Sequence, residues 1–175
     1  MSKFKQKMHF KCRPSTPCAR GCGKAAFVLP LVLIALGTLT RWVSGSPLPT
    51  LHYVGARDLL PPIWLIVLLF CISYAVAGLA LGLVLGTRAP CGERRYQGAM
   101  YFVISLALGY AWYPLFFAAR VFLVASAAGV LCLIFSVLAS FCFAYVRRTA
   151  FFLSLIYDAW LIYLTLLNIK IIFTL

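Results

Sequence analysis

Residues 156 to 170, IYDAWLIYLTLLNIK, place side chains capable of chemistry in an apolar background. At about 100° per residue, Tyr157, Trp160, Leu164 and Asn168 form one narrow stripe of a helix. Polar groups cost free energy in hydrocarbon unless partners compensate them. The stripe therefore either packs against neighbouring helices through hydrogen bonds, or lines an apolar ligand cavity in which its polar groups orient the ligand.

The adjoining face of the same helix carries Asp158 and Thr165. Asp158 is the only acidic residue within the long apolar segments. A hydrogen bond to a neighbouring helix, or a neutral protonated carboxyl, is favoured there over a role in proton transfer.

Two other segments carry patterns of small or aromatic residues. In GLALGLVLG, Gly78, Gly82 and Gly86 recur every fourth residue, which lets two helix backbones approach closely, within the chain or between two copies of it. In GYAWYPLFFAAR, Trp112 and Phe116 share a helix face beside a bend expected at Pro114. Such aromatic rings belong to a packed core, a membrane-interface belt or the wall of a site for a flat ligand.

Several kinds of site have no support in the residues. The two histidines, His9 and His52, lie outside the apolar segments, so paired histidine ligation of haem within a membrane is not expected. The tail cysteines Cys12, Cys18 and Cys22 match no metal-binding spacing, and we predict no metal site. With three acidic residues and no nucleophile–base pair, neither a hydrolase nor an ion-coupled transporter is favoured.

Long apolar segments must position these residues. The chain has 175 residues, of which 64% are hydrophobic and 11% charged, a composition typical of an integral membrane protein. We predict an all-α bundle of five transmembrane helices at residues 25–44, 62–86, 98–118, 121–144 and 150–172. Residues 1–24 form a basic cytoplasmic tail, and residues 25–175 form the membrane domain.

The positive charge is unevenly distributed along the chain. Most lysines and arginines lie in the tail and in the loops that follow the second and fourth spans. The exceptions are Arg41, Arg57, Arg120 and Lys170. This asymmetry predicts a cytoplasmic N-terminus and an external C-terminus, and it explains the charge without a nucleic-acid partner.

Three motifs in register resemble those of the TspO/MBR family, the translocator proteins or tryptophan-rich sensory proteins. The second span carries Pro61, Pro62, Trp64, Phe70, Tyr74 and Gly78. The third ends in Trp112, Pro114, Leu115, Phe116 and Phe117, and the fifth carries Tyr157, Trp160, Leu167 and Asn168. The chain departs from the family pattern at Phe70, which replaces a tryptophan, at Ser105 and Gly109, which replace glutamine and asparagine, and at Ile156 and Leu164, which replace proline and alanine.

The resemblance implies a five-helix membrane protein, commonly a homodimer, that binds tetrapyrroles such as porphyrin or haem and, in some members, sterol-like ligands. Light-dependent porphyrin degradation is ascribed to bacterial members through tryptophans of the second and fifth helices. Because Phe70 replaces one of these tryptophans, we expect a receptor, sensor or carrier rather than an enzyme. We expect it in a bacterial cytoplasmic membrane and without an obligatory cofactor. A small-molecule transporter and a structural or assembly subunit remain alternatives.

If the resemblance holds, the ligand lies in an intramembrane pocket that opens toward the outer side. The ligand-binding residues are then expected to be Phe70, Tyr74, Trp112, Phe116, Tyr157, Trp160, Leu164 and Asn168. The ligand carboxylates are expected to meet Arg41, Arg57 or Arg120, the cations on that side.

Overall fold

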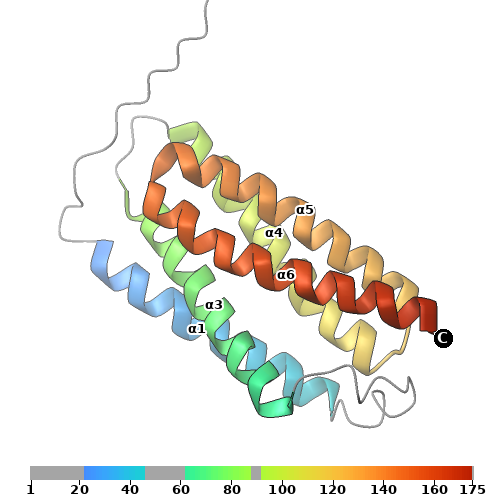
Figure 1. Ribbon diagram of the computed structural model, residues 1–175. Coiled ribbons are helices and arrows are strands. Elements are labelled where there is room, and N and C mark those ends of the chain that lie inside the picture. The colour runs from blue at the N-terminus through green and yellow to red at the C-terminus, as the bar shows by residue number, and fades with distance from the viewer. Residues whose placement is uncertain (1–21, 46–61, 88–91, 175) are drawn as a thin grey trace, which may run out of the picture.

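The computed structural model describes residues 22–45, 62–87 and 92–174 of the chain. Within these ranges helices are the only regular secondary structure, and short turns join some of them (Figure 1). The helices are α1 (Cys22–Ser44), α3 (Ile63–Leu85), α4 (Gly92–Phe117), α5 (Phe122–Val146) and α6 (Arg148–Thr174). All five are long and apolar enough to cross a membrane, which confirms the predicted fold class. Most of the basic tail and all of the loop that contains Arg57 lie outside the described residues.

The helix bounds agree with the predicted spans to within three residues, except that α4 begins at Gly92 rather than at residue 98. The additional turns carry charge. Arg94 lies over the ring of Tyr145 at 4.5 Å, and Arg95 donates a hydrogen bond to the Thr87 carbonyl at 2.8 Å. Hydrophobic patterning detects only the apolar part of a helix, so it misses turns that extend beyond the hydrocarbon.

The helices pack in the cyclic order α1, α3, α6, α5, α4, with α4 returning to α1. Helices α5 and α6 run side by side, and α1 lies along α3 (Figure 1). The turn between α4 and α5 is short, and Arg120 adopts a left-handed conformation in it, with φ of 55°. Such short connections make consecutive helices antiparallel neighbours.

The close pairing of α1 and α3 depends on Gly78. A Cβ atom at this position would lie 2.5 Å from the backbone of Pro30 on α1, so no larger residue fits without moving a helix. Gly82 is buried on the same helix, whereas Gly86 caps the helix end and donates its N–H to the Gly82 carbonyl at 3.0 Å. At Gly78 the glycine row therefore serves packing within the chain.

Candidate functional site

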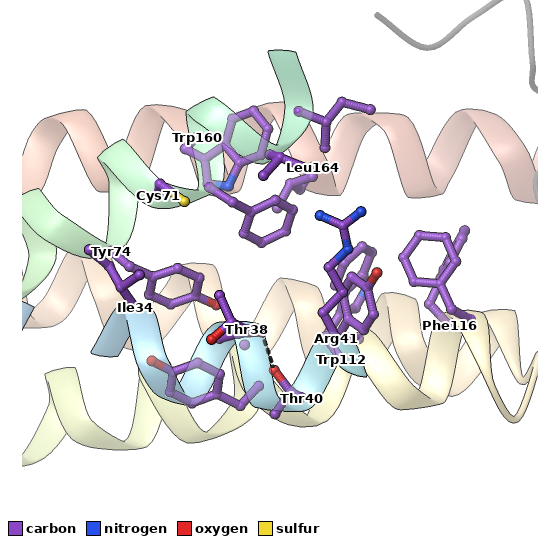
Figure 2. Close-up of a pocket in the computed structure, with 18 of the residues that line it drawn as sticks. Ile34, Thr38, Thr40, Arg41, Cys71, Tyr74, Trp112, Phe116, Trp160 and Leu164 are labelled. Carbon is purple, nitrogen blue, oxygen red and sulfur yellow. Dashed lines mark hydrogen bonds between the residues drawn. The ribbon is translucent and has the colours of Figure 1, made fainter. Parts of the chain in front are cut away.

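A cleft lies between the C-terminal halves of α1, α4 and α6 and the N-terminal half of α3 (Figure 2). Its cavity volume is about 120 Å³, several times what one water molecule requires. The lining residues come from all four helices. They are Ile34, Gly37, Thr38, Thr40, Arg41, Ile66, Val67, Phe70, Cys71, Tyr74, Gly109, Tyr110, Trp112, Tyr113, Phe116, Phe117, Trp160, Tyr163, Leu164 and Leu167.

Aromatic rings form two walls of this cleft. On the α3 and α6 side, Phe70 meets Trp160 edge-on, with ring centroids 5.3 Å apart, and Trp160 stacks on Tyr163 at 5.4 Å. On the α4 side, Trp112 stacks on Phe116 at 5.2 Å. Offset and edge-on contacts of this kind hold aromatic rings in place, so both walls present fixed π surfaces.

A smaller cavity, called the recess below, lies against α5 and has a volume of about 20 Å³. It shares six lining residues with the cleft, namely Phe70, Tyr74, Gly109, Trp112, Trp160 and Leu164. Its other lining residues are Gly129, Cys132, Tyr157, Leu161, Thr165 and Asn168. The structure thus brings all eight predicted ligand-binding residues around two neighbouring spaces, with Tyr157 and Asn168 at the recess only.

Four polar atoms of the recess lack hydrogen-bond partners within residues 22–45, 62–87 and 92–174. They are Nε1 of Trp112, Nε1 of Trp160, the hydroxyl of Tyr157 and Oδ1 of Asn168, on side chains that are 6%, 8%, 1% and 2% exposed. A buried polar atom without a partner costs about 1–3 kcal/mol. Two N–H donors, one hydroxyl that can donate or accept, and one acceptor are therefore available to a ligand group or to water.

Two other polar side chains of the recess, those of Thr165 and Cys132, are already paired. The hydroxyl of Thr165 donates to the Leu161 carbonyl at 2.8 Å on its own helix. The thiol of Cys132 donates to the Ser105 carbonyl at 3.1 Å, and the Ser105 hydroxyl donates to the Cys132 carbonyl at 2.9 Å. The unpaired groups of the recess thus come from α4 and α6.

Two glycines that sequence patterns did not assign to the site shape the recess. A Cβ atom at Gly129 would lie 3.6 Å from Asn168 Nδ2 and 3.8 Å from Trp112 Cδ1, and one at Gly109 would lie 3.6 Å from the Tyr157 hydroxyl. These are ordinary contact distances, so alanine would fit at either position and occupy recess volume. The signal for Gly109 is its place in the family pattern, where it replaces an asparagine, whereas Gly129 carries no such signal.

The three cations predicted near the ligand differ in position. Arg41 is half-buried and lines the cleft, and Figure 2 shows its guanidinium extending from α1 into the space between the helices. Arg120 is exposed in the turn between α4 and α5 and does not line the cleft. Arg57 lies outside the described residues. Within those residues, neither a carboxylate nor another acceptor pairs with Arg41, so its charge faces the cleft.

Asp158 faces away from the cleft. Its carboxylate accepts hydrogen bonds from the Ser136 hydroxyl and, at 2.6 Å, from the Ser140 hydroxyl, both on α5. The predicted hydrogen bond between helices is confirmed.

A sequence profile of the TspO/MBR family matches residues 26–174, nearly the whole described chain. The chain belongs to the TspO/MBR family. No curated protein matches it. It is accordingly a multi-pass integral membrane protein with a sensor- or transporter-like role. In this TspO/MBR chain, residues from all three motifs line the cleft or the recess, among them Phe70 on α3, Trp112 on α4 and Trp160 on α6.

Proposed function

We propose that this TspO/MBR protein is a membrane receptor or carrier that binds a tetrapyrrole, such as porphyrin or haem, in the cleft. The observation that carries the proposal is an aromatic-walled cleft that also holds an arginine without an acidic partner among the described residues. A tetrapyrrole has a broad π face for the ring walls and carboxylates for the guanidinium of Arg41.

The charge of Arg41 makes a carboxylate ligand more favourable than a purely apolar one. A cation in partly apolar surroundings gains from an anion that forms a paired hydrogen bond with it, and arginine can bind a carboxylate through two parallel N–H groups. Sterol-like ligands would use the aromatic walls without this pairing. Their binding, and the predicted homodimer, stay predictions.

We further propose that the ligand binds without chemical conversion. Phe70 stands where a family tryptophan is implicated in porphyrin degradation, and its phenyl ring packs edge-on against Trp160 without an N–H group. The aromatic walls can therefore contact and orient the ligand, but they lack the pair of tryptophans that is implicated in porphyrin degradation.

Titration of the detergent-purified protein with protoporphyrin, followed through the Soret band, tests the proposal. Saturable binding is expected, and Trp160→Leu should weaken it roughly tenfold because it removes a stacking surface. Trp64→Leu is the matched control, since Trp64 is 67% exposed and does not line the cleft.

Linear binding that neither substitution changes would contradict the proposal and favour a structural or assembly subunit. Illumination of the complex with analysis of the products separates binding from degradation: the absence of light-dependent products is expected, and their appearance would identify an enzyme.

A further inference from the structure

Arginines gather at the end of the bundle where α4 begins and α5 turns into α6 (Figure 1). They are Arg94, Arg95, Arg147 and Arg148, and the only acidic residue close to them in the sequence is Glu93. Four arginines and one glutamate give this group of residues a net charge of +3. The cleft lies toward the other end, in the C-terminal half of α4, so these arginines are remote from it.

Two of the four arginines are held by hydrogen bonds at the turns between helices. Arg95 donates to the Thr87 carbonyl at 2.8 Å, which joins the start of α4 to the end of α3. Arg147 donates from Nε to the Thr149 hydroxyl at 2.9 Å, in the turn between α5 and α6. These two arginines therefore stabilise the connections, and the other two are the candidates for binding a partner.

Arg94 is positioned by the ring of Tyr145 on α5. Its guanidinium carbon lies 4.5 Å from the ring centroid, a cation–π contact. The two helices touch one turn further along α4, where a Cβ atom at Gly98 would lie 2.7 Å from Cβ of Cys142. Stacking uses the face of a guanidinium, whereas its N–H groups lie in its plane and suit phosphate oxygens. Because the ring fixes Arg94, less side-chain entropy is lost when an anion binds.

Exposed aromatic side chains lie one helical turn from this contact and from Arg148. Phe141 precedes Tyr145 by four residues on α5, and Phe152 follows Arg148 by four residues on α6. Both phenylalanines are exposed, and residues four apart share a helix face. A molecule that contacts the arginines and these rings together needs an anionic head and an apolar body. A phospholipid of the surrounding membrane has both, whereas an inorganic anion has no apolar body.

We propose that Arg94, Tyr145 and Arg148 form a binding site for the headgroup of an anionic phospholipid. The phosphate accepts hydrogen bonds from both arginines, Tyr145 holds the Arg94 guanidinium in place, and the acyl chains lie along Phe141 and Phe152. The net positive charge favours a lipid with a negative headgroup over a zwitterionic one, whose ammonium group would meet the arginines. The site is separate from the cleft, so this proposal does not rest on the proposed function.

Native mass spectrometry of the full-length protein, released from detergent with added lipid, tests the site. Phosphatidylglycerol is expected to bind more tightly than phosphatidylcholine with the same acyl chains. The double substitution Arg94→Gln and Arg148→Gln should weaken phosphatidylglycerol binding roughly thirtyfold, the loss expected for two arginines that face anionic lipid. The matched control is Lys5→Gln with Lys7→Gln, which removes the same charge from the basic tail and should change the affinity less than about twofold.

Tyr145→Leu keeps every charge and removes only the ring beneath Arg94. A loss of roughly threefold is expected, since a cation–π contact at an exposed site is modest. Attraction by net charge alone predicts no change for this variant and equal losses for the arginine and lysine pairs, and either result would overturn the proposal. Inorganic phosphate in excess should leave the lipid bound; displacement would show that the arginines recognise a free anion instead of a phospholipid.

Thermal unfolding of each variant in detergent establishes that it is folded. Arg148→Gln alone, at an exposed position, takes the place of the double variant if Arg94 is needed for folding. A loss of roughly fivefold in phosphatidylglycerol affinity is then expected, and an unchanged affinity would overturn the proposal.

Discussion

Helix α6 contributes polar side chains to two regions, and these side chains have hydrogen-bond partners in one region but not in the other. At the seam with α5, the carboxylate of Asp158 accepts hydrogen bonds from Ser136 and Ser140. About three turns further along α6, Asn168 has an amide oxygen buried in the recess with no partner among the described residues. In the seam, composed of Ser136, Ser140 and Asp158, the side chains hydrogen-bond to one another within the protein. The recess, in contrast, has unpaired polar groups that a ligand can bind.

This difference separates stabilisation from ligand recognition. In a low-dielectric interior, a polar group bonded to another helix fixes the register of that helix pair, because losing either partner is costly. An unpaired group lowers stability in the absence of ligand and strengthens binding when the ligand supplies its partner. Substitutions at the seam and at the recess should therefore change stability in opposite directions.

The largest effect is expected from removing both serines of the seam. The double substitution Ser136→Ala and Ser140→Ala leaves the Asp158 carboxyl buried without donors, so the free energy of unfolding should fall by about 2–4 kcal/mol. Unfolding in mixed detergent micelles measures the change. Ser154→Ala is the control, because its hydroxyl bonds only to the Phe151 carbonyl of its own helix. If the double variant and the control were equally stable, the distinction between seam and recess would fail.

Gly78→Ala extends the comparison to the wall of the cleft. The added Cβ would lie 2.5 Å from the backbone of Pro30 and force α1 away from α3, so stability should fall by about 1–3 kcal/mol and porphyrin affinity should fall with it. The same unfolding assay and the Soret titration measure both losses. Gly109→Ala meets only ordinary contacts and should keep the helix pair intact. Unchanged stability of Gly78→Ala would show that the two helices can separate without cost.

Arg41→Gln tests the charged edge of the cleft. Affinity for protoporphyrin should fall roughly tenfold through loss of a charge-assisted hydrogen bond. The dimethyl ester of protoporphyrin has no carboxylate, so its affinity should be the same for both proteins. Arg120→Gln is a control, since Arg120 is exposed and does not line the cleft. Equal losses for the acid and the ester would mean that Arg41 contributes packing rather than charge.

The smallest effect, and the one of opposite sign, is expected from Trp112→Phe and Trp160→Phe without ligand. Each removes an unpaired N–H group and keeps an aromatic ring, so the free energy of unfolding should stay within about 1 kcal/mol of the original or rise. Differential scanning calorimetry of each variant without ligand measures this change in stability. A loss as large as that of the serine double variant would show that the indole N–H groups have partners in the protein, and the recess would then resemble the seam.

Sequence patterns predicted the spans well because a membrane helix must bury its apolar length in hydrocarbon, a requirement that each segment meets by itself. They also placed Trp160, Leu164 and Asn168 on one face, which the recess confirms. The opening turns of α4 were missed because they are charged, and Gly129 was missed because a glycine has no side chain to form a pattern.

The sequence alone determined the five helices, the side chains on each helix face and the membership of the TspO/MBR family, because composition, periodicity and motif spacing are properties of the linear chain. Only the tertiary structure decided which polar groups found partners. Asp158 and Asn168 lie on one helix, and their difference comes from what the neighbouring helix presents at each level: two serine hydroxyls opposite Asp158, and the bare backbone of Gly129 beside Asn168. That depends on how α5 and α6 align, which is set by packing between helices rather than by either segment alone.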